Sequence, residues 1–252
     1  MTTDSFPSDP ASRKAIFVLE QHDIEKSAYT GVARQLLDDE VYVLQVPVRN
    51  ETSSALQHII ASHLARPGCV LIQSPYDPDV YEDVSLAPQR FALEKHVHFM
   101  TLCMHLGARE VSVEQLDLHT STGNSTVDVK GTRLGVGAQL TVENEQLEKL
   151  RAQMRLHDEF AGAAPDIAAA ERLLKQTGLS FDPVMRGLLE MRRGSANQLI
   201  ERKLVLSLSS EVKSNLKVLG RINVPAFVKL SVDYKRLVRE EHDFTLTVRV
   251  RF

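Results

Sequence analysis

Apolar residues alternate with polar residues along the C-terminal part of the chain. From Leu204 to Tyr234 the even-numbered positions are almost all apolar, whereas most odd-numbered positions are polar or charged, and the alternation resumes from Phe244 to Phe252. A period of two residues is typical of β-strands with one buried face. The region therefore predicts amphipathic antiparallel strands. Because the parity is kept, the connections should be three or five residues long, with Gly220 at the centre of a three-residue turn, or a strand should continue through a bend.

Strand and helix patterns alternate in the N-terminal part of the chain. Four short apolar runs predict strands, and three longer periodic stretches between them predict helices. Short apolar strands that alternate with helices favour a parallel sheet with helices on both faces. We therefore expect an α/β domain with a three-layer parallel sheet. The predicted strands lie at 15–19, 41–46, 69–72 and 110–113, and the helices at 24–37, 54–64 and 86–106.

The region from residue 121 to residue 252 predicts a second domain of the α+β class. It begins with a hairpin over residues 126–142 and a helix over residues 144–160, and continues with two short helices and the alternating strands. Residues 1–13 are polar and contain prolines, which predicts a disordered N-terminus. The sequence thus divides into this segment, an α/β domain over 14–120, and an α+β domain with a helical pair and a basic C-terminal sheet.

The two short helices have clear capping residues. Asp166 is placed to cap the first helix, which should end at Gly178, and Asp182 with Pro183 should begin a second helix that ends at Gly194. Two helices joined by a short glycine-containing turn resemble helix-turn-helix domains. The resemblance implies that the second helix enters the major groove of DNA; a structural helical hairpin is the alternative. The residues then nearest DNA are Ser180, Met185, Arg186, Glu190 and Arg193.

Charges are distributed unevenly along the chain. The 252 residues carry a net charge of −3, but the segment Arg192–Phe252 holds 13 Lys and Arg against 6 Asp and Glu, a net charge of +7. A basic segment of this kind indicates an anionic partner, with nucleic acid favoured over a membrane surface. Docking on the acidic N-terminal part, or lysines that only keep the sheet soluble, are the alternatives. The residues predicted to contact phosphate are Arg192, Arg193, Lys213, Lys217, Arg221 and Lys229.

Three carboxylates follow predicted strands of the N-terminal domain. Glu20 comes directly after the first strand, and Asp77 and Asp79 form an Asp-x-Asp sequence after the third strand. This pattern resembles the Toprim domains of topoisomerases, primases and some nucleases. The resemblance implies that the three carboxylates bind Mg²⁺ and act in phosphoryl transfer. The alternative is that residues 76–79 form an ordinary turn.

Histidines and cysteines do not form a recognisable metal motif. His96, His98 and His105 share one predicted helix, and partly buried histidines explain them better than a zinc site, because no i, i+4 pair or carboxylate motif accompanies them. Cys69 and Cys103 fit buried thiols in a reducing compartment better than a disulfide.

Composition and patterning together favour a cytoplasmic protein. With 43% hydrophobic residues the chain can bury a substantial core, and it shows neither an apolar run near the roughly 20 residues that cross a bilayer nor an export signal. The favoured function is binding of an anionic macromolecule, above all nucleic acid, through the basic sheet and helical pair. The alternatives are a Toprim-like Mg²⁺-dependent phosphoryl-transfer enzyme or nuclease, a structural or partner-binding subunit, including a homo-oligomer, and a membrane-acting amphipathic β protein.

Overall fold

Two units, each assembled from segments far apart in the sequence, make up the chain. The first consists of Met1–Pro88 and Glu211–Glu241, and the second of Gln89–Ser210 and His242–Phe252. The predicted domain boundary between residues 120 and 121 falls within the second unit. The computed structural model describes residues 6–29, 38–48, 53–120, 123–128, 133–135, 140–154, 156–194, 198–222 and 243–252.

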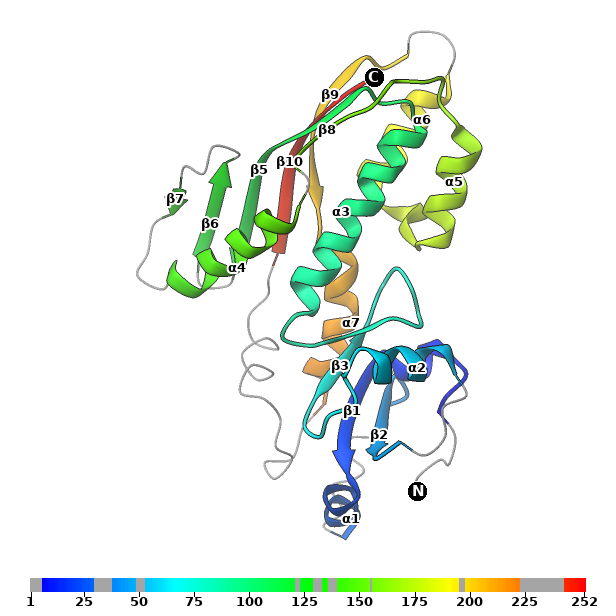
Figure 1. Cartoon of the computed structure of the whole chain (residues 1–252), viewed down its shortest axis with the longest axis vertical. Coiled ribbons are helices and arrows are strands. Elements are labelled where there is room, and N and C mark those ends of the chain that lie inside the picture. Colours follow the sequence, from blue (N-terminus) through cyan, green and yellow to red (C-terminus); the bar gives the residue numbers. More distant parts are fainter. Residues whose placement is uncertain are drawn as a thin grey trace. The chain divides into compact units, whose positions relative to one another are not determined.

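The first unit contains a four-stranded mixed sheet (Figure 1). Its order is β2-β1-β3-β4, with β1 parallel to β2, and β3 antiparallel to both β1 and β4. The prediction of a purely parallel sheet is therefore wrong, because an apolar run indicates burial on both faces but does not fix the direction of the strand. The elements are η1 Pro10–Arg13, β1 Ala15–Glu20, α1 Gln21–Tyr29, β2 Val41–Val46, α2 Ser54–Ala61, β3 Val70–Gln73, β4 Tyr81–Asp83 and α7 Ser210–Gly220.

A short 3-10 helix lies in the N-terminal segment for which the sequence predicts disorder. Within residues 1–13, Pro10–Arg13 form η1. The Arg13 side chain is buried, and its guanidinium donates to the Tyr81 hydroxyl at 2.7 Å and to the Pro78 carbonyl at 2.9 Å. A buried guanidinium requires such partners, so these bonds tie the end of the segment to the sheet.

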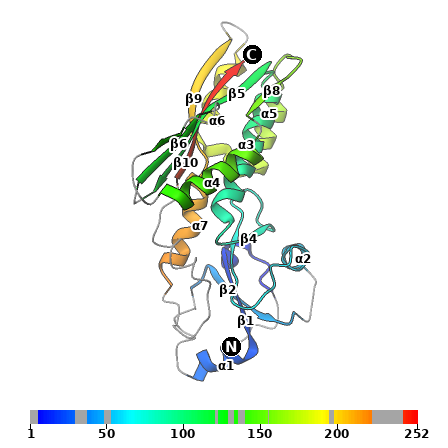
Figure 2. The same cartoon turned by 60° about the vertical axis from the view of Figure 1, so that its left-hand side comes forward.

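The second unit is built around a six-stranded antiparallel sheet (Figure 2). Its order is β7-β6-β5-β10-β9, and β8 pairs with the first residues of β5. The strand predicted at 110–113 is the start of β5 and so belongs to this sheet. The elements are α3 Ala87–His105, β5 Glu110–Thr120, β6 Gly123–Asp128, β7 Arg133–Gly135, α4 Leu140–Gln153, β8 His157–Glu159, α5 Ile167–Gln176, η3 Leu179–Phe181, α6 Pro183–Arg193, β9 Glu201–Ser207 and β10 Asp243–Arg251.

A β-bulge interrupts the ladder between β5 and β10. The register shifts between Thr247 and Val248, which leaves Glu114 of β5 as the additional residue. The bulge allows Val113 and Leu116, three positions apart, both to be buried. It therefore changes the parity of the buried row within one strand.

The stretch from Ser210 to Gly220 is helix α7, where the even-numbered apolar row predicts a strand. Val212 and Leu219 are both buried on this helix and are seven residues apart, which is two helical turns. The step of four from Val212 to Leu216 fits a helical period as well as a strand period, so the even row was ambiguous here, and the strand prediction is wrong. Gly220 ends the helix and does not centre a hairpin turn. The rest of the row falls in residues 223–242, outside the described residues.

The predicted hairpin and helix between β5 and α5 have different bounds in the structure. The hairpin predicted to extend to residue 142 stops before α4, which begins at Leu140, and the helix predicted to extend to residue 160 ends at Gln153. Strand β8 follows. Its three polar residues lack apolar alternation, so the sequence pattern gives no indication of a strand there.

Both capped helices are confirmed. The Asp166 carboxylate accepts a hydrogen bond from the Ala169 N–H at 2.9 Å at the start of α5. The Asp182 carboxylate accepts from the Val184 and Met185 N–H groups at 3.0 and 2.9 Å at the start of α6. These bonds satisfy N–H groups that have no partner within the helix.

A buried ion pair joins α3 to the start of α6. The Lys95 ammonium lies 2.7 Å from the Asp182 carboxylate, with side chains that are 0% and 4% exposed. Lys95 also donates to the Ser210 hydroxyl at 2.9 Å. Asp182 thus caps a helix and neutralises a buried cation at once. Charges removed from water are tolerated only with such partners.

Gly107 allows two backbone segments of the second unit to lie in close contact. Its φ is +80°, and a Cβ atom built there would lie 2.2 Å from the Ala163 carbonyl oxygen. Glycine is the residue that adopts this conformation without a steric penalty. The glycine after α3 therefore permits the segment before α5 to pack against it.

Replacing Lys95 tests the importance of the buried ion pair. Lys95→Met should lower the free energy of unfolding by about 3–5 kcal/mol, because it leaves the Asp182 carboxylate buried beside no cation. Adding Asp182→Asn should recover part of the loss, since asparagine still caps a helix and carries no charge. Lys203→Met is the control, because Lys203 forms an exposed ion pair and should change stability by less than about 1 kcal/mol. Urea denaturation of the wild type and these three variants measures the differences; a Lys95→Met effect no larger than the control contradicts the assignment.

Alanine substitutions at Gly107 and Gly187 test the close backbone contact, and their effects on the free energy of unfolding should be opposite. Gly107→Ala should lower the free energy of unfolding by at least about 2 kcal/mol, because of its positive φ and the Ala163 oxygen. Gly187→Ala should raise it by about 0.5–1 kcal/mol, since Gly187 lies inside α6 and a Cβ atom built there would have no neighbouring atom within 4 Å outside its own helix backbone. Equal effects of the two substitutions would argue against the close backbone contact.

Candidate functional site

The three carboxylates predicted to bind Mg²⁺ do not converge. Glu20 lies where β1 and β2 both end, while Asp77 and Asp79 follow β3. Because β3 runs antiparallel to β1, with Ala15 opposite Ile72, β3 ends beside the beginning of β1. Glu20 is five residues further along β1, roughly 16 Å away at about 3.3 Å per residue. The strand directions therefore leave no metal site that Glu20 could share with the two aspartates.

Both aspartates accept hydrogen bonds from residues of the first unit. The Arg13 guanidinium lies 2.8 Å from the Asp79 carboxylate, and the Ser54 hydroxyl donates to the same carboxylate. The hydrogen bonds from Ser54 and from Arg13 lower the pKa of Asp79. The Asp77 carboxylate accepts the Asp79 N–H at 2.9 Å, which is an Asx-turn bond. The bond between Asp77 and Asp79 is that of an ordinary turn, the alternative interpretation of residues 76–79, and the Asp79 carboxylate is also paired with Arg13 and Ser54.

Arg192, predicted to contact phosphate, is buried in the second unit. Its guanidinium donates to the carbonyl oxygens of Leu106 and Leu199 at 3.1 and 2.8 Å. It also lies 4.4 Å from the centre of the Phe252 ring. Arg192 therefore connects the end of α3, the segment before β9 and the C-terminal residue, and is not placed to contact a macromolecule.

Two other predicted cations are paired with carboxylates. Arg193 contacts Glu171 of α5, and Arg221 contacts Glu40. Hydrogen bonds from Lys14 and from Arg221 lower the pKa of Glu40. Exposed ion pairs stabilise a fold only slightly, but they cancel the charge that a phosphate would meet.

The predicted lysines lie in the first unit or outside the described residues. Lys213 of α7 is half-buried and Lys217 is exposed, whereas Lys229 lies outside the described residues. Arg192 and Arg193 belong to the second unit. The predicted phosphate contacts are thus divided between two units.

The exposed face of the second unit's sheet pairs its cations with carboxylates of neighbouring strands. Glu114, the bulge residue, contacts Lys203 of β9 and Arg249 of β10, both at 2.7 Å. The hydrogen bond from Lys203, with the charge of Arg249, lowers the pKa of Glu114. Arg251 contacts Glu110 at 3.0 Å. The charge count of the basic segment therefore overstates the positive charge that this face presents.

Other predicted kinds of site are not found in the described part of the chain. Met185, expected near DNA, is completely buried, whereas Arg186 and Glu190 are exposed. Among the described residues, no three His, Cys, Asp or Glu side chains are grouped so that they could hold a metal ion. No helix among them has the length and apolarity needed to cross a bilayer.

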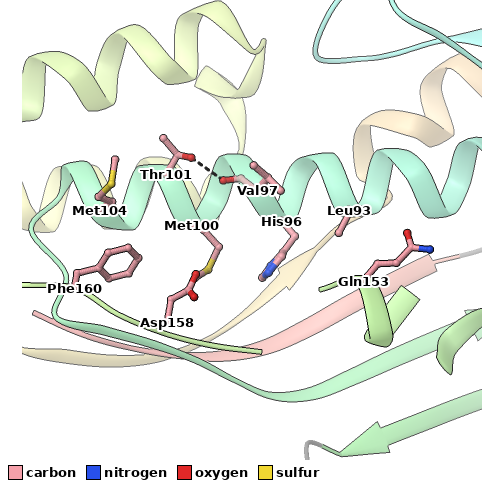
Figure 3. Close-up of a pocket in the computed structure, with 9 residues that line it drawn as sticks. All are labelled: Leu93, His96, Val97, Met100, Thr101, Met104, Gln153, Asp158 and Phe160. Atoms are coloured by element: carbon pink, nitrogen blue, oxygen red, sulfur yellow. Dashed lines mark hydrogen bonds between the residues drawn. The ribbon is translucent and has the colours of Figure 1, made fainter. Parts of the chain in front are cut away.

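A pocket of about 310 Å³ lies in the second unit (Figure 3). One wall is a single stripe of α3, with residues at positions i, i+3, i+4, i+7, i+8 and i+11, which is the spacing of one helix face. The opposite wall comes from the end of α4 and from β8 with the residue after it. The lining residues are Leu93, His96, Val97, Met100, Thr101, Met104, Gln153, Asp158 and Phe160.

Helix α3 presents different sides to α6 and to the pocket. Lys95 contacts Asp182, while the next residue, His96, points into the pocket beside Met100 (Figure 3). Consecutive residues of a helix project about 100° apart, because 3.6 residues complete a turn. The ion pair therefore fixes the rotation of α3 that directs His96 toward β8.

Asp158 places a carboxylate on the inward side of β8. It lies opposite Val111, which is completely buried, in the ladder with β5. His157 and Glu159 are exposed, whereas Asp158 and Phe160 are half-buried and line the pocket. Since successive side chains of a strand point to opposite faces, Asp158 occupies a position that normally carries an apolar residue.

Sequence reasoning did not find this pocket. It identified His96 as a residue of an apolar helix, but it placed Asp158 in the helix predicted over 144–160. The α3 stripe is visible in the sequence as an apolar face from Leu93 to Met104. Whether such a face meets a packed neighbour or a pocket depends on the opposite wall, which is far away in the sequence.

The lowered pKa of Asp79 predicts acid sensitivity of the first unit. A carboxylate whose pKa is lower in the folded state than in the unfolded state stabilises the fold at pH values above its unfolded pKa of about 3.9. This stabilisation is lost as the pH falls through the pKa of the folded state. The difference in unfolding free energy between wild type and Asp79→Asn should therefore shrink as the pH is lowered from about 6 to 2. Ser54→Ala should reduce the difference, because the Ser54 hydroxyl is the main cause of the shift. Denaturation at several pH values tests this; a difference independent of pH contradicts the assignment.

Comparisons of the chain with protein-family models, with curated proteins and with solved structures found no match. The function proposed below therefore rests on side-chain geometry alone.

Proposed function

We propose that this protein binds a small organic ligand in the pocket between α3 and β8. The observation that carries the proposal is a concave site of about 310 Å³ with mainly apolar walls and a few polar side chains directed into it. Small-molecule sites in proteins typically have volumes of about 300–1,000 Å³ and this kind of lining. The volume suits a compound of one ring or a short branched chain.

Three polar side chains from different elements support the proposal. His96 comes from α3, Gln153 from the end of α4 and Asp158 from β8. A neutral imidazole and an amide can each donate and accept hydrogen bonds, whereas a carboxylate accepts them. Polar groups held by three elements can orient a ligand that the apolar walls bind.

Nucleic-acid binding through the basic segment stays a prediction from the charge count. The burial of Arg192 and the ion pairs of Lys203 and Arg249 give it less support than the pocket gives to a small ligand. A fluorescent duplex titrated at low and high salt separates the two, since phosphate contacts weaken steeply with salt. The separation of Glu20 from Asp79 gives a Toprim-like enzyme less support than the pocket gives to a small ligand.

Methionine methyl groups provide direct probes of the pocket. Met100 and Met104 line it, whereas Met185 and Met191 of α6 do not. In carbon–hydrogen NMR spectra of ¹³C-methyl-methionine protein, fragments that bind should shift the signals of Met100 and Met104 and leave those of Met185 and Met191 unchanged. At about 0.3 kcal/mol per heavy atom, fragments of about 12 atoms should bind with dissociation constants in the millimolar range.

Two matched tryptophan variants control this experiment. Met104→Trp should weaken fragment binding at least tenfold, because the larger side chain occupies part of the pocket. Met191→Trp should leave binding unchanged, although Met191 and Met104 are 45% and 47% exposed and the added volume is the same. If no fragment of a mixed neutral, cationic and anionic set shifts Met100 or Met104, the proposed function is wrong.

A further inference from the structure

We infer that the ligand of this pocket carries an aromatic ring at one end and a hydrogen-bonding polar group, such as a carboxamide, at the other. The inference rests on the proposed function, because it names the class of ligand for the same site. Its basis is the order of the side chains along the pocket. The α3 wall extends from Leu93 to Met104, which is roughly 16 Å at about 1.5 Å per residue.

The main chain after β8 places Phe160 at the Met104 end of the pocket. The Phe160 N–H donates to the Arg109 carbonyl at 2.8 Å, and Arg109 follows closely after His105, the last residue of α3. The side chains of Phe160 and Met104 lie together at this end in Figure 3. A ligand group bound here therefore meets an aromatic ring from one wall and a thioether from the other.

An aromatic ring of the ligand gains more from these neighbours than an aliphatic group does. Aromatic rings attract one another in edge-to-face and offset-stacked arrangements, and thioether sulfurs make favourable contacts with ring edges. Phe160 offers the first kind of contact, and Met104 with Met100 offers the second. Phe160 is half-buried and Met100 is buried, so the ligand ring is also removed from water.

The other end of the pocket carries an amide side chain. Gln153 is the last residue of α4, and in Figure 3 its side chain lies at the Leu93 end of the α3 stripe. His96, one turn further along α3, lies between the two ends. An amide both donates and accepts hydrogen bonds, so Gln153 can pair with a carboxamide, which does the same. The polar group of the ligand is therefore expected at Gln153.

Packing within the protein is the competing explanation for this lining. Phe160 and the two methionines can serve only to cover the end of α3, and Gln153 can lie at the surface as the last residue of its helix. That role requires no preference between an aromatic and a saturated ring, and no fixed direction of the ligand. A ligand role predicts both, so affinity and orientation distinguish the two explanations.

Phenylbutanamide and cyclohexylbutanamide, with the ring at the end of the chain, are matched probes of the ring. The saturated ring is the more hydrophobic, so walls that only exclude water would favour the cyclohexyl compound. Titrations followed by the Met100 methyl signal should instead show at least about threefold tighter binding of the phenyl compound. Phe160→Leu should remove this preference. Phe181→Leu is the control, because Phe181 is 87% exposed between α5 and α6, and it should retain the preference.

A second pair of variants tests the polar end. Gln153→Leu should weaken binding of phenylbutanamide at least about threefold, since it removes a hydrogen-bond partner. Gln176→Leu is the control, because Gln176 ends α5 as Gln153 ends α4 and both are exposed, and it should leave binding unchanged. Nuclear Overhauser contacts of the Met104 methyl should come from the ring protons of phenylbutanamide and not from the methylene beside its carboxamide.

The possible results separate the inference from the proposed function. Equal or tighter binding of cyclohexylbutanamide overturns the inference and leaves the pocket proposal standing. A ring preference that persists in Phe160→Leu, an unchanged affinity in Gln153→Leu, or Met104 contacts with the carboxamide end overturn it as well. Binding by neither probe overturns the inference alone if other fragments bind, and the proposed function itself if none does. If a variant does not fold, the two probes and the Met104 contacts in the wild type still decide.

Discussion

The buried ion pair between Lys95 and Asp182 is the contact on which the second unit depends. Two buried charges are tolerated only when they pair with each other. The pair therefore constrains the position of α3 relative to the start of α6. Asp182 adds the two N–H bonds that begin α6, and Lys95 adds the bond to Ser210. One cluster therefore fixes a helix position and a helix start, and it holds the Ser210 side chain.

The pocket follows from the same constraint. With Lys95 held on one side of α3, the helical repeat places Leu93, His96 and Met100 on another side, where β8 supplies the opposite wall. β8 is held by its pairing with the start of β5. Several cations of the basic segment are used inside the fold, as Arg192 is, or paired at the sheet surface, as Arg249 is.

Local features were predictable where the physical cause is local. Asp166 and Asp182 cap helices because an aspartate before a helix start can reach N–H groups two or three residues ahead. The apolar runs at 15–19 and 41–46 form strands β1 and β2 as expected. The prediction was wrong over Ser210–Gly220, because Val212 and Leu216, four positions apart, fit a strand period as well as a helix period. It missed β8, because three polar residues carry no period at all.

The amino-acid sequence alone indicates where most helices and strands form and how the capped helices begin. It also shows that the C-terminal segment is rich in cations. Those properties depend on residues within one or two turns of each other. Only the tertiary structure decided the direction of β3, which separates Glu20 from Asp79, and the pairing of cations with Glu114 and Glu110. It alone also brought Asp158 to face His96 and Met100 across one pocket. Strand direction, ion pairing and cavities depend on residues that are distant in the chain, and no local pattern specifies them.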